Sequence, residues 1–297
     1  MDEHIEDTGP PVLRTIHSKP LLIYGTSRKE NRTAFLTETA LNIGFTAVDT
    51  ANYPPAYKES HTGDGIAAAL KSGVVKRGDL WIQTKFCPAF AMPRDQLPYN
   101  PDQSIEGQVK ESIQQSLENL KVEYLDAFLL HGPYRDNEDS IAAYKAFEQF
   151  VPHTIKQLGV SNVSLQQLKA VYDAASVKPT IVQNRFMRDT SYDIEVRHFC
   201  AGHNITYQAF YMLTHNPELL ASDVLASVAE RLNIEKEVAF YVLVLSLGDV
   251  QVLDGTTQSV RMKADLTEIT SIFKNDRTIS DLKPFVIEFK KLLQTSV

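Results

Sequence analysis

The sequence predicts an α/β fold of the (β/α)8 TIM-barrel type, in a single domain spanning residues 1–297. Short apolar segments alternate with helical segments, which is the pattern of parallel βαβ units. Eight such units fit the chain length of 297 residues, because a barrel of this type takes about 250 residues. An open doubly wound sheet is the competing interpretation. The turn after its first strand, residues 25–30, has no G-x-G-x-x-G sequence to hold a dinucleotide.

Each expected strand is a short apolar run that ends in a turn or in a polar residue. The first, Leu21-Leu-Ile-Tyr24, is continuously apolar, as is typical of a parallel strand buried on both faces. The eight strands are expected to begin near residues 21, 46, 81, 125, 156, 180, 205 and 250. Before them, residues 11–16 predict one more strand, so we expect a short N-terminal β-hairpin cap, preceded by a flexible arm over residues 1–11.

Between the strands, apolar residues recur with helical spacing. In residues 104–120, Ile105, Val109 and Ile113 fall on one helical face. Gly44 is a typical C-terminal stop for the helix that precedes it. The same reasoning predicts helices over residues 31–43, 65–71, 104–120, 140–150, 164–175, 193–203, 223–232, 235–247, 259–273 and 280–294.

Composition and charge argue against several classes of function. A net charge of −7 disfavours binding to nucleic acid or to an anionic membrane. The two cysteines, Cys87 and Cys200, fit a reducing compartment, and neither has the spacing of a metal ligand. The N-terminus has no apolar run like that of a signal peptide, and the longest apolar run, residues 238–245, is too short to span a bilayer. We therefore expect a cytoplasmic protein.

Reactive side chains gather where the expected strands end. Asp49, Lys85 and His131 each stand at the carboxyl end of a strand. In a barrel these ends converge on one face, where barrel enzymes carry their active sites. The loop after Asp49 is stiffened by two consecutive prolines and adds two tyrosines, Tyr53 and Tyr57. These positions predict a constellation of an aspartate, a lysine, a histidine and one tyrosine.

Each of these groups suits the reduction of a carbonyl. A tyrosine hydroxyl has an ordinary pKa of about 10, and a neighbouring lysine ammonium is expected to lower this pKa. A buried lysine needs a counter-charge, which Asp49 supplies. His131 can donate a hydrogen bond to a carbonyl oxygen as negative charge builds on that oxygen. Since no side chain delivers a hydride, the hydride has to come from a cofactor.

Five motifs, in order and at comparable spacing, make a family resemblance specific. They are Gly44-Phe-Thr-Ala-Val-Asp-Thr-Ala51, Trp81-Ile-Gln-Thr-Lys85, Tyr124-Leu-Asp-Ala-Phe-Leu-Leu-His131, Gln157-Leu-Gly-Val-Ser-Asn162 and Pro179-Thr-Ile-Val-Gln-Asn184. With these motifs the chain resembles the aldo-keto reductases from about residue 20 to residue 270.

The resemblance implies a (β/α)8 barrel that binds NADP(H) across its C-terminal face, with NAD(H) as the alternative. It implies that Tyr57 donates the proton, that Lys85 and Asp49 tune Tyr57, and that His131 orients the substrate carbonyl. The implied cofactor-binding residues are Gly25, Thr26, Asp49, Ser161, Asn162, Gln183, Phe210, Gly255, Thr256, Thr257 and Arg261. Among these, Ser161, Asn162 and Gln183 would hold the nicotinamide carboxamide, and the ring of Phe210 would lie against the nicotinamide.

The spacing of the loop after Asp49 assigns the proton donor. The common family pattern has the tyrosine five positions after the aspartate, where this chain has Pro54; Tyr53 follows by four positions and Tyr57 by eight. A fungal and plant-like branch of the family carries D-T-A-N-x-P-x-x-Y-x-E, which residues 49–59 match without gaps. This resemblance favours Tyr57 as the donor and makes Tyr53 a pocket wall.

The region expected to bind the cofactor's 2′-phosphate departs from the family pattern, which is I-P-K-S-x-x-x-x-R. This chain has Asp254 at the proline position and Gly255 at the lysine position, and it keeps Arg261. One arginine can grip a phosphate with two hydrogen bonds. NADP(H) is the expected cofactor, since Arg261 is kept. The lost lysine and the added carboxylate predict reduced discrimination against NAD(H).

The expected substrate-facing residues suit an aromatic or aliphatic carbonyl better than a phosphorylated sugar. They are His131, Tyr53, Trp81, Phe86, Tyr134, Tyr211 and Met212. The first functional hypothesis is a monomeric, NADP(H)-dependent reductase of aldehydes and ketones, with no nucleic-acid or membrane partner. The alternative is a dinucleotide-binding, redox-sensing regulatory subunit with little catalysis. A metal-dependent barrel hydrolase is disfavoured because no His-x-His or carboxylate cluster stands at a strand end.

Overall fold

The computed structural model describes residues 19–295. The expected arm over residues 1–11 and the strand over residues 11–16, with its hairpin cap, lie outside the described residues. Within residues 19–295, every helix is too short or too polar to cross a membrane.

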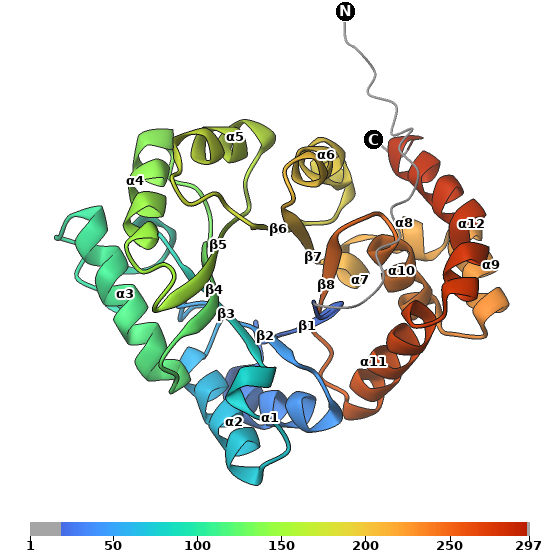
Figure 1. The fold of residues 1–297 in the computed structure, drawn as a ribbon, viewed down its shortest axis with the longest axis horizontal. Helices are drawn as coiled ribbons and strands as arrows, with labels where there is room; N and C mark the ends of the chain where they lie inside the picture. Colours follow the sequence, from blue (N-terminus) through green and yellow to red (C-terminus); the bar gives the residue numbers. More distant parts are fainter. Residues whose placement is uncertain (1–18, 296–297) are drawn as a thin grey trace, which may run out of the picture.

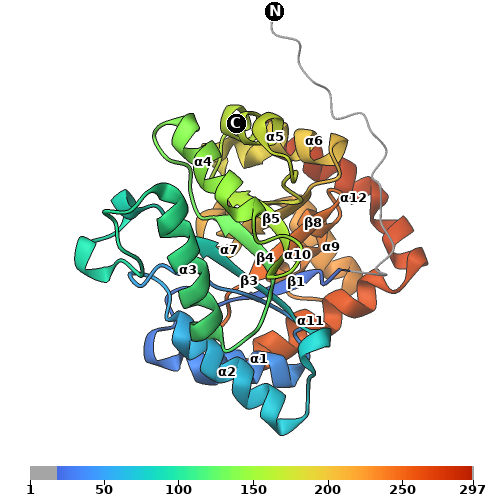
Figure 2. The same ribbon diagram turned by 60° about the vertical axis from the view of Figure 1, so that its left-hand side comes forward.

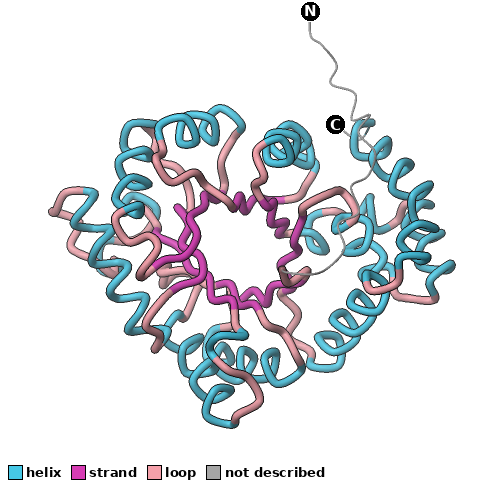
Figure 3. Tube along the Cα trace, viewed as in Figure 1, coloured by secondary structure: helices cyan, strands magenta, loops and turns pink. Residues whose placement is uncertain are grey.

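Eight parallel strands close into a barrel, which confirms the predicted fold. The strands follow one another in chain order around the ring, and β8 pairs with β1 to close it. Their bounds are β1 Leu22–Gly25, β2 Ala47–Asp49, β3 Trp81–Phe86, β4 Leu125–Leu130, β5 Ile155–Ser161, β6 Ile181–Arg185, β7 Thr206–Phe210 and β8 Val250–Asp254. Figures 1 and 3 show this ring end-on inside a layer of helices. Because all pairings are parallel, the carboxyl ends of the strands open on one face.

The helices form the outer layer. Their bounds are α1 Thr33–Ile43, α2 Glu59–Ser72, α3 Ile105–Leu120, α4 Asn137–Glu148, α5 Leu165–Ala174, α6 Ile194–Gly202, α7 Met212–His215, α8 Pro217–Leu220, α9 Asp223–Leu232, α10 Lys236–Leu245, α11 Ser259–Phe273 and α12 Asp276–Thr295. Short 3-10 helices are η1 Glu30–Arg32, η2 Arg77–Asp79, η3 Ala89–Ala91, η4 Arg94–Gln96 and η5 Arg188–Asp193. In Figure 2, α1 to α4 succeed one another around the barrel. The last helix, α12, packs on α9, α10 and α11.

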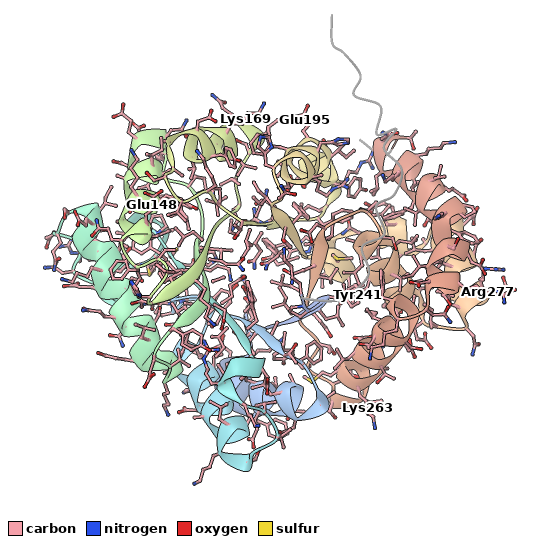
Figure 4. The ribbon with its side chains drawn as sticks, in the orientation of Figure 1. Glu148, Lys169, Glu195, Tyr241, Lys263 and Arg277 are labelled. Carbon is pink, nitrogen blue, oxygen red and sulfur yellow. The ribbon has the colours of Figure 1, made fainter. Side chains whose placement is uncertain are left out.

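The main apolar core lies between the barrel and this outer layer. Tyr241 of α10, for example, is only 3% exposed. By contrast, Lys169, Glu195, Lys263 and Arg277 point outward from the helices that surround the barrel (Figure 4). This division of side chains is the one expected of helices that cover a closed sheet.

The largest departure from the predicted helices is at α2, which begins at Glu59 rather than at Gly65. Glycines lower helix propensity, so Gly63 and Gly65 obscure the first half of this helix in the sequence. A Cβ atom on Gly63 would lie 2.0 Å from the carbonyl oxygen of Asn119 in α3. A Cβ atom on Gly65 would lie 2.4 Å from that of Ala34 in α1. Both glycines therefore let α2 approach its neighbours closely.

The other predicted helices are confirmed with ends that shift by at most four residues, and the short helices α7 and α8 after β7 were not predicted.

A Gly63→Ala substitution tests the close packing of α2. Its methyl group has no room unless α2 and α3 separate, so we expect the free energy of unfolding to fall by about 2–4 kcal/mol. The matched control is Gly202→Ala in α6, where an added Cβ atom meets nothing within 4 Å. For this control we expect a change of at most about 1 kcal/mol. Urea unfolding followed by circular dichroism measures both variants, and equal stabilities would contradict the packing argument.

The inside of the barrel is more polar than is usual. A small apolar cluster of Ala127, Leu129 and Ile181, with Trp81 packed against it, fills one part. Four buried glutamines from β3, β6, β7 and β8 fill another: Gln83, Gln183, Gln208 and Gln251. Barrel interiors are normally filled by branched apolar side chains, so each of these amides needs a hydrogen-bond partner.

The four glutamines, which we call the glutamine chain, are linked to one another. Gln83 Nε2 and Gln183 Nε2 each donate to Gln208 Oε1 at 2.9 Å. Gln208 Nε2 donates to Gln251 Oε1 at 3.0 Å. Gln251 Nε2 donates to the carbonyl oxygen of Pro20, ahead of β1, at 2.6 Å. The glutamine chain thus connects the N-terminal end of the barrel with β3 and β6.

Candidate active site

The predicted reactive side chains come together at the carboxyl ends of β2, β3 and β4. Asp49 is the last residue of β2, Lys85 is next to last in β3, and His131 directly follows β4. Tyr57, from the loop between β2 and α2, lies edge-on to His131 with ring centroids 5.8 Å apart. Lys85 Nζ lies 5.4 Å from the centroid of the Tyr57 ring. The structure thus places all four side chains in one site.

Asp49 and Lys85 form a buried ion pair. The Lys85 ammonium donates to Asp49 Oδ1 at 2.6 Å, to Oδ2 at 2.7 Å and to the carbonyl oxygen of Thr50 at 2.7 Å. The two side chains are 0% and 1% exposed. Burial lowers the pKa of Lys85, and the charge of Asp49 raises it. All three ammonium protons have acceptors, so the position of the ammonium is fixed.

The glutamine chain holds the carboxylate end of this pair. Gln83 Nε2 donates to Asp49 Oδ1 at 2.7 Å, and Gln183 Nε2 donates to the same oxygen at 2.9 Å. Hydrogen bonds of this kind favour the charged form of a carboxylate. The amide nitrogen of Gln183, predicted to hold a cofactor, thus donates to Asp49 and Gln208.

Tyr57 keeps its proton in this site. Burial raises its pKa above the ordinary value, and the charge of Asp49 raises it further, while a hydrogen bond with Ser27 offsets part of the rise. Burial and the charge of Asp49 therefore outweigh any lowering by Lys85, and the expectation of a lowered pKa for Tyr57 is wrong. Lys85 directs its three protons to Asp49 and Thr50 rather than to the Tyr57 hydroxyl.

His131 is held as a neutral imidazole. Burial lowers its pKa to about 3, and the positive charges of Lys85 and Arg185 add to the effect. Its backbone is fixed on both sides: its N–H donates to the Phe86 carbonyl at 2.8 Å, and its carbonyl accepts from Asn162 Nδ2 at 2.7 Å. Its Nδ1 atom is buried and has no hydrogen-bond partner among residues 19–295. A neutral imidazole offers one donor and one acceptor, so it can hydrogen bond to a carbonyl oxygen.

Tyr53 reaches the same histidine from the other tyrosine position. Its ring lies edge-on to His131 with centroids 5.4 Å apart. Its hydroxyl donates to the carbonyl oxygen of Ala91 at 3.3 Å, in the loop between β3 and α3. The proximity of the Lys85 ammonium to the Tyr57 ring and this engagement of the Tyr53 hydroxyl favour Tyr57 as the acid.

An unsatisfied amide oxygen marks the end of β5. Asn162 Nδ2 donates to the His131 carbonyl and, at 3.1 Å, to Ser161 Oγ. Ser161 Oγ donates to the Gln183 carbonyl at 2.6 Å. Asn162 Oδ1 is buried and has no partner within residues 19–295. A buried acceptor without a donor is costly, and a carboxamide NH2 group would satisfy it.

Phe210 and Gly25 also lie at the carboxyl ends of their strands. Phe210 ends β7, is partly exposed, and has its ring centroid 5.0 Å from that of Tyr211. Gly25 ends β1 and pairs with Asp49. Thr26 departs from the prediction, because its side chain is fully buried and donates to the Asp49 carbonyl at 2.9 Å. Its hydroxyl links β1 to β2 rather than facing a ligand.

Lys29 places a positive charge beside Gly255, the position at which the family pattern has a lysine. Lys29, in the loop between β1 and α1, donates from its ammonium to the Gly255 carbonyl. The same nitrogen is 3.7 Å from the position that a Cβ atom of Gly255 would take. Arg32 Nη2 donates to the Thr257 carbonyl at 3.2 Å. The β8–α11 loop, which includes Thr256, thus has two cations from the β1–α1 region beside it.

Arg261 is the other predicted cation of this region. It lies in α11, is 57% exposed, and has its Nη1 atom 3.9 Å from Glu237 Oε1. Asp254, which precedes Gly255, is buried, and its Oδ1 accepts from the Thr256 N–H at 2.9 Å. Burial and the charge of Asp254 raise the pKa of Asp265 to about 7. Asp265, which lies in α11 after this loop, therefore carries only part of a negative charge near neutral pH.

Three of the predicted pocket walls are wrong. Trp81 is the first residue of β3, at the opposite end of the strand from Lys85, and packs inside the barrel. Phe86 is fully buried and stacks on Tyr99 with centroids 5.3 Å apart. It follows Lys85 directly, so its side chain points to the other face of the sheet. Met212 is 3% exposed and belongs to the main core.

Tyr134 and Tyr211 remain wall candidates beside Tyr53. Tyr134 is partly buried, and its ring centroid is 5.8 Å from that of Phe90, which is 58% exposed. Tyr211 is 41% exposed. Phe90 was not predicted from the sequence, because a proline-rich loop gives no periodic signal that places a single side chain.

Other residues of the site were also missed. Gln83 and Arg185 could have been found, because each lies two residues from a predicted inward-facing residue, Lys85 or Gln183, in the same strand. Nothing in the sequence pattern pointed to Lys29, since it meets Gly255 through closure of the barrel. Within residues 19–295, no group of three or more His, Cys, Asp or Glu side chains could hold a metal ion.

Comparison with curated proteins finds reductases. The chain is 29% identical over 207 residues to "Glyoxal reductase" of Bacillus subtilis, covering 69% of this chain and 66% of that protein. It is 30% identical over 145 residues to "Methylglyoxal reductase DkgA" of Salmonella typhimurium, covering 48% and 45%. It is 30% identical over 210 residues to "NADPH-dependent codeinone reductase 1-4" of Papaver somniferum, covering 65% and 59%. The chain thus spans less than two thirds of the length of these relatives.

Comparison with solved structures supports the fold, and a family model supports the assignment. The chain matches Bombyx mori aldo-keto reductase in complex with NADP with a TM-score of 0.73, at 19% identity and over 91% of this chain and 90% of that one. It matches an aldo/keto reductase from Brucella melitensis with a TM-score of 0.71, at 22% identity and over 90% and 95%. The model of the Aldo/keto reductase family matches residues 22–220, from β1 to the end of α8. With more than half of its length matched and the barrel formed as described, this chain belongs to the aldo/keto reductase family.

Proposed function

We propose that the protein reduces aldehyde or ketone carbonyls to alcohols with NADP(H). The observation that carries the proposal is the convergence of Tyr57, His131 and the Asp49–Lys85 pair at the carboxyl ends of adjacent strands. These side chains can donate a proton, orient a carbonyl and stabilise negative charge. The relatives named glyoxal reductase and codeinone reductase support the same reaction class.

The residues at the ends of β5 and β7 fit a nicotinamide cofactor. The unpartnered Asn162 Oδ1 can accept from a carboxamide NH2 group, Ser161 lies beside it, and Phe210 offers a flat aromatic face. NADPH, when bound, would supply the hydride. Gln183 can join this site by exchanging one of its present partners for the carboxamide. On this proposal the protein contributes binding, orientation and the proton.

The raised pKa of Tyr57 suits it to keep its proton until the substrate oxygen becomes basic. Neutral His131 donates a hydrogen bond to that oxygen and aligns it. As Tyr57 releases its proton, the nearby Lys85 ammonium stabilises the phenolate that forms. Asp49, the glutamine chain and Thr50 keep the ammonium charged and in place. Catalysis then depends on a buried charge pair that never has to move.

The decay of NADPH absorbance in the presence of a panel of aldehydes and ketones tests the proposal. Turnover that saturates with at least one carbonyl compound supports a reductase. The alternative, a redox-sensing subunit, requires that NADPH binds, as measured by quenching of protein fluorescence, while no carbonyl is turned over. The monomeric state and the cytoplasmic location stay predictions, and size-exclusion chromatography with light scattering tests the first.

Lys29 supports a preference for NADP(H) over NAD(H), because it places an ammonium where the family lysine is missing. We expect Lys29→Gln to weaken NADPH binding about tenfold, or roughly 1.4 kcal/mol, while the Kd for NADH changes by less than about twofold. Titration of protein fluorescence measures both constants. The buried Asp254 nearby weakens the site, so the wild-type preference for NADPH should stay below about a thousandfold.

The matched control for this prediction is Lys121→Gln. Lys121 carries the same charge but pairs with Asp64 on the outer helices. It should leave both constants unchanged. An equal loss for NADPH and NADH in Lys29→Gln would instead mean that Lys29 only holds the backbone of the β8–α11 loop.

A further inference from the structure

Arg185 is a cation placed at the carboxyl end of the barrel by the register of β6. Gln183, two residues earlier in the strand, points into the barrel, where it bonds to Asp49 and Gln208. Residues two apart in a strand share a face, so Arg185 continues this inward face at the strand's last position. It pairs across the sheet with Phe210. Its side chain is exposed, at the end of the barrel where the carboxyl ends of the strands open.

The neighbours of Arg185 locate its charge near the reacting groups. Its guanidinium carbon lies 5.7 Å from the centroid of the Tyr211 ring. Its positive charge helps to lower the pKa of His131, the residue proposed to orient the carbonyl. Tyr211 in turn lies near enough to Tyr57 to influence that hydroxyl. Arg185 and Tyr211 therefore lie near His131 and Tyr57, at the carboxyl ends of the strands.

The charge of Arg185 has no counter-ion among the residues that the structure describes. Among residues 19–295, no carboxylate oxygen lies within 4.0 Å of the Arg185 guanidinium, whereas Arg77, Arg94 and Arg231 pair with carboxylates. The Arg185 guanidinium lies over the aromatic face of Tyr211 instead. With a net charge of −7 on the whole chain, an unpaired guanidinium in this space favours an anionic group that comes from outside the protein.

We propose that Arg185 binds a carboxylate of the substrate, so that the preferred substrates are carbonyl compounds that carry a carboxylate a few bonds from the carbonyl carbon. This inference rests on the proposed function and narrows its substrate class. A guanidinium matches a planar carboxylate with two parallel hydrogen bonds. The closeness of Arg185 to His131 limits the separation of the two groups, which suits short oxo acids and carboxylated aldehydes. The aromatic walls Tyr53 and Tyr134 would cover the carbon skeleton between them.

The test compares substrates that differ only in charge. Succinic semialdehyde and its methyl ester form one pair, and 4-carboxybenzaldehyde and its methyl ester form another. We expect the wild-type kcat/KM to be at least about tenfold higher for each acid than for its ester. In Arg185→Gln this advantage should vanish, because kcat/KM for the acids falls at least about tenfold while that for the esters stays within about twofold. Arg185→Lys should keep part of the advantage, since it keeps the positive charge but loses the planar guanidinium that makes two parallel hydrogen bonds.

The matched control is Arg188→Gln, an exposed arginine at the start of η5 in the loop that follows β6. It removes the same charge three residues further along the chain and should leave the ratio of acid to ester unchanged. Three results would overturn the inference. They are an equal loss on acids and esters in Arg185→Gln, an equal loss of the acid preference in Arg188→Gln, and a wild-type preference for glyceraldehyde 3-phosphate over every carboxylate.

Binding measurements distinguish this inference from two other outcomes: that Arg185 binds the cofactor, and that the proposed reductase function fails. If Arg185 instead held the cofactor's phosphates, Arg185→Gln would weaken NADPH binding in fluorescence titration, which would overturn the inference. If the wild-type protein reduced no carbonyl, the proposed function would fail. Calorimetry with 4-hydroxybutanoate, the alcohol product, in the presence of NADP+ would then decide the carboxylate site alone. Binding that is lost in Arg185→Gln but kept in Arg188→Gln supports the site, and equal binding overturns it.

Discussion

The Tyr57→Phe variant should lose about 10²- to 10⁴-fold in kcat for carbonyl reduction, the usual contribution of a positioned general acid. The substitution removes only the hydroxyl, so the ring contact with His131 and the approach of Lys85 can persist. The Kd for NADPH should change little. Stopped-flow single-turnover reduction measures the chemical step directly, free of any slow product release.

Tyr53→Phe is the matched control, because Tyr53 lies on the same loop and contacts the same histidine ring. It should keep most of the single-turnover rate, since its hydroxyl bonds to the Ala91 carbonyl. If Tyr53→Phe were the inactive variant and Tyr57→Phe the active one, the assignment of the proton donor would be reversed. Equal, partial losses would mean that neither hydroxyl is the acid.

The second large effect concerns the Asp49–Lys85 pair. Breaking a buried pair by removing one partner leaves an uncompensated charge, so Lys85→Met and Asp49→Asn should each lower the free energy of unfolding by about 3–5 kcal/mol. Both should also lose most of the activity, because the ammonium no longer stabilises the phenolate of Tyr57. Urea unfolding and single-turnover kinetics measure the two effects separately.

The double variant Asp49→Asn/Lys85→Met distinguishes stability from catalysis. It removes both charges, and neutral replacements of a buried pair are often tolerated. Its stability should therefore recover by more than about 2 kcal/mol relative to either single variant, while its activity stays as low as theirs. If the double variant were as unstable as the sum of the single losses, the two residues would not act as a pair.

The fold could be predicted because strands and strand ends carry strong local signals. Apolar runs such as Leu21–Tyr24 and Leu125–Leu130 have few other ways to be buried, and parallel strands bring their carboxyl ends to one face. That rule alone placed Asp49, Lys85 and His131 together. The start of α2 was missed because Gly63 and Gly65 carry no helical signal, although close packing requires them.

The wall of the site was harder to predict than its chemistry. Trp81 and Phe86 were assigned to the pocket by residue type, but the direction of β3 and its alternation of faces exclude both. Lys29 and Gly255 are 226 residues apart in the chain, and only the pairing of β1 with β8 brings their loops together. The lowering predicted for the Tyr57 pKa was wrong because burial and the charge of Asp49 raise this pKa, and the sequence does not say how deeply a loop side chain is buried.

The glutamine chain has a consequence for how Tyr57 regains its proton after the reaction. Carboxyl, imidazole and water groups can pass a proton along a wire, but an amide nitrogen keeps its hydrogens at physiological pH and an amide oxygen is scarcely basic. The route from Asp49 through Gln83, Gln208 and Gln251 to Pro20 thus stabilises the charge of Asp49 but does not conduct protons. In the proposed reaction, the proton that Tyr57 gives up must be replaced from the open face of the barrel, so that reprotonation has to wait until the product uncovers that face.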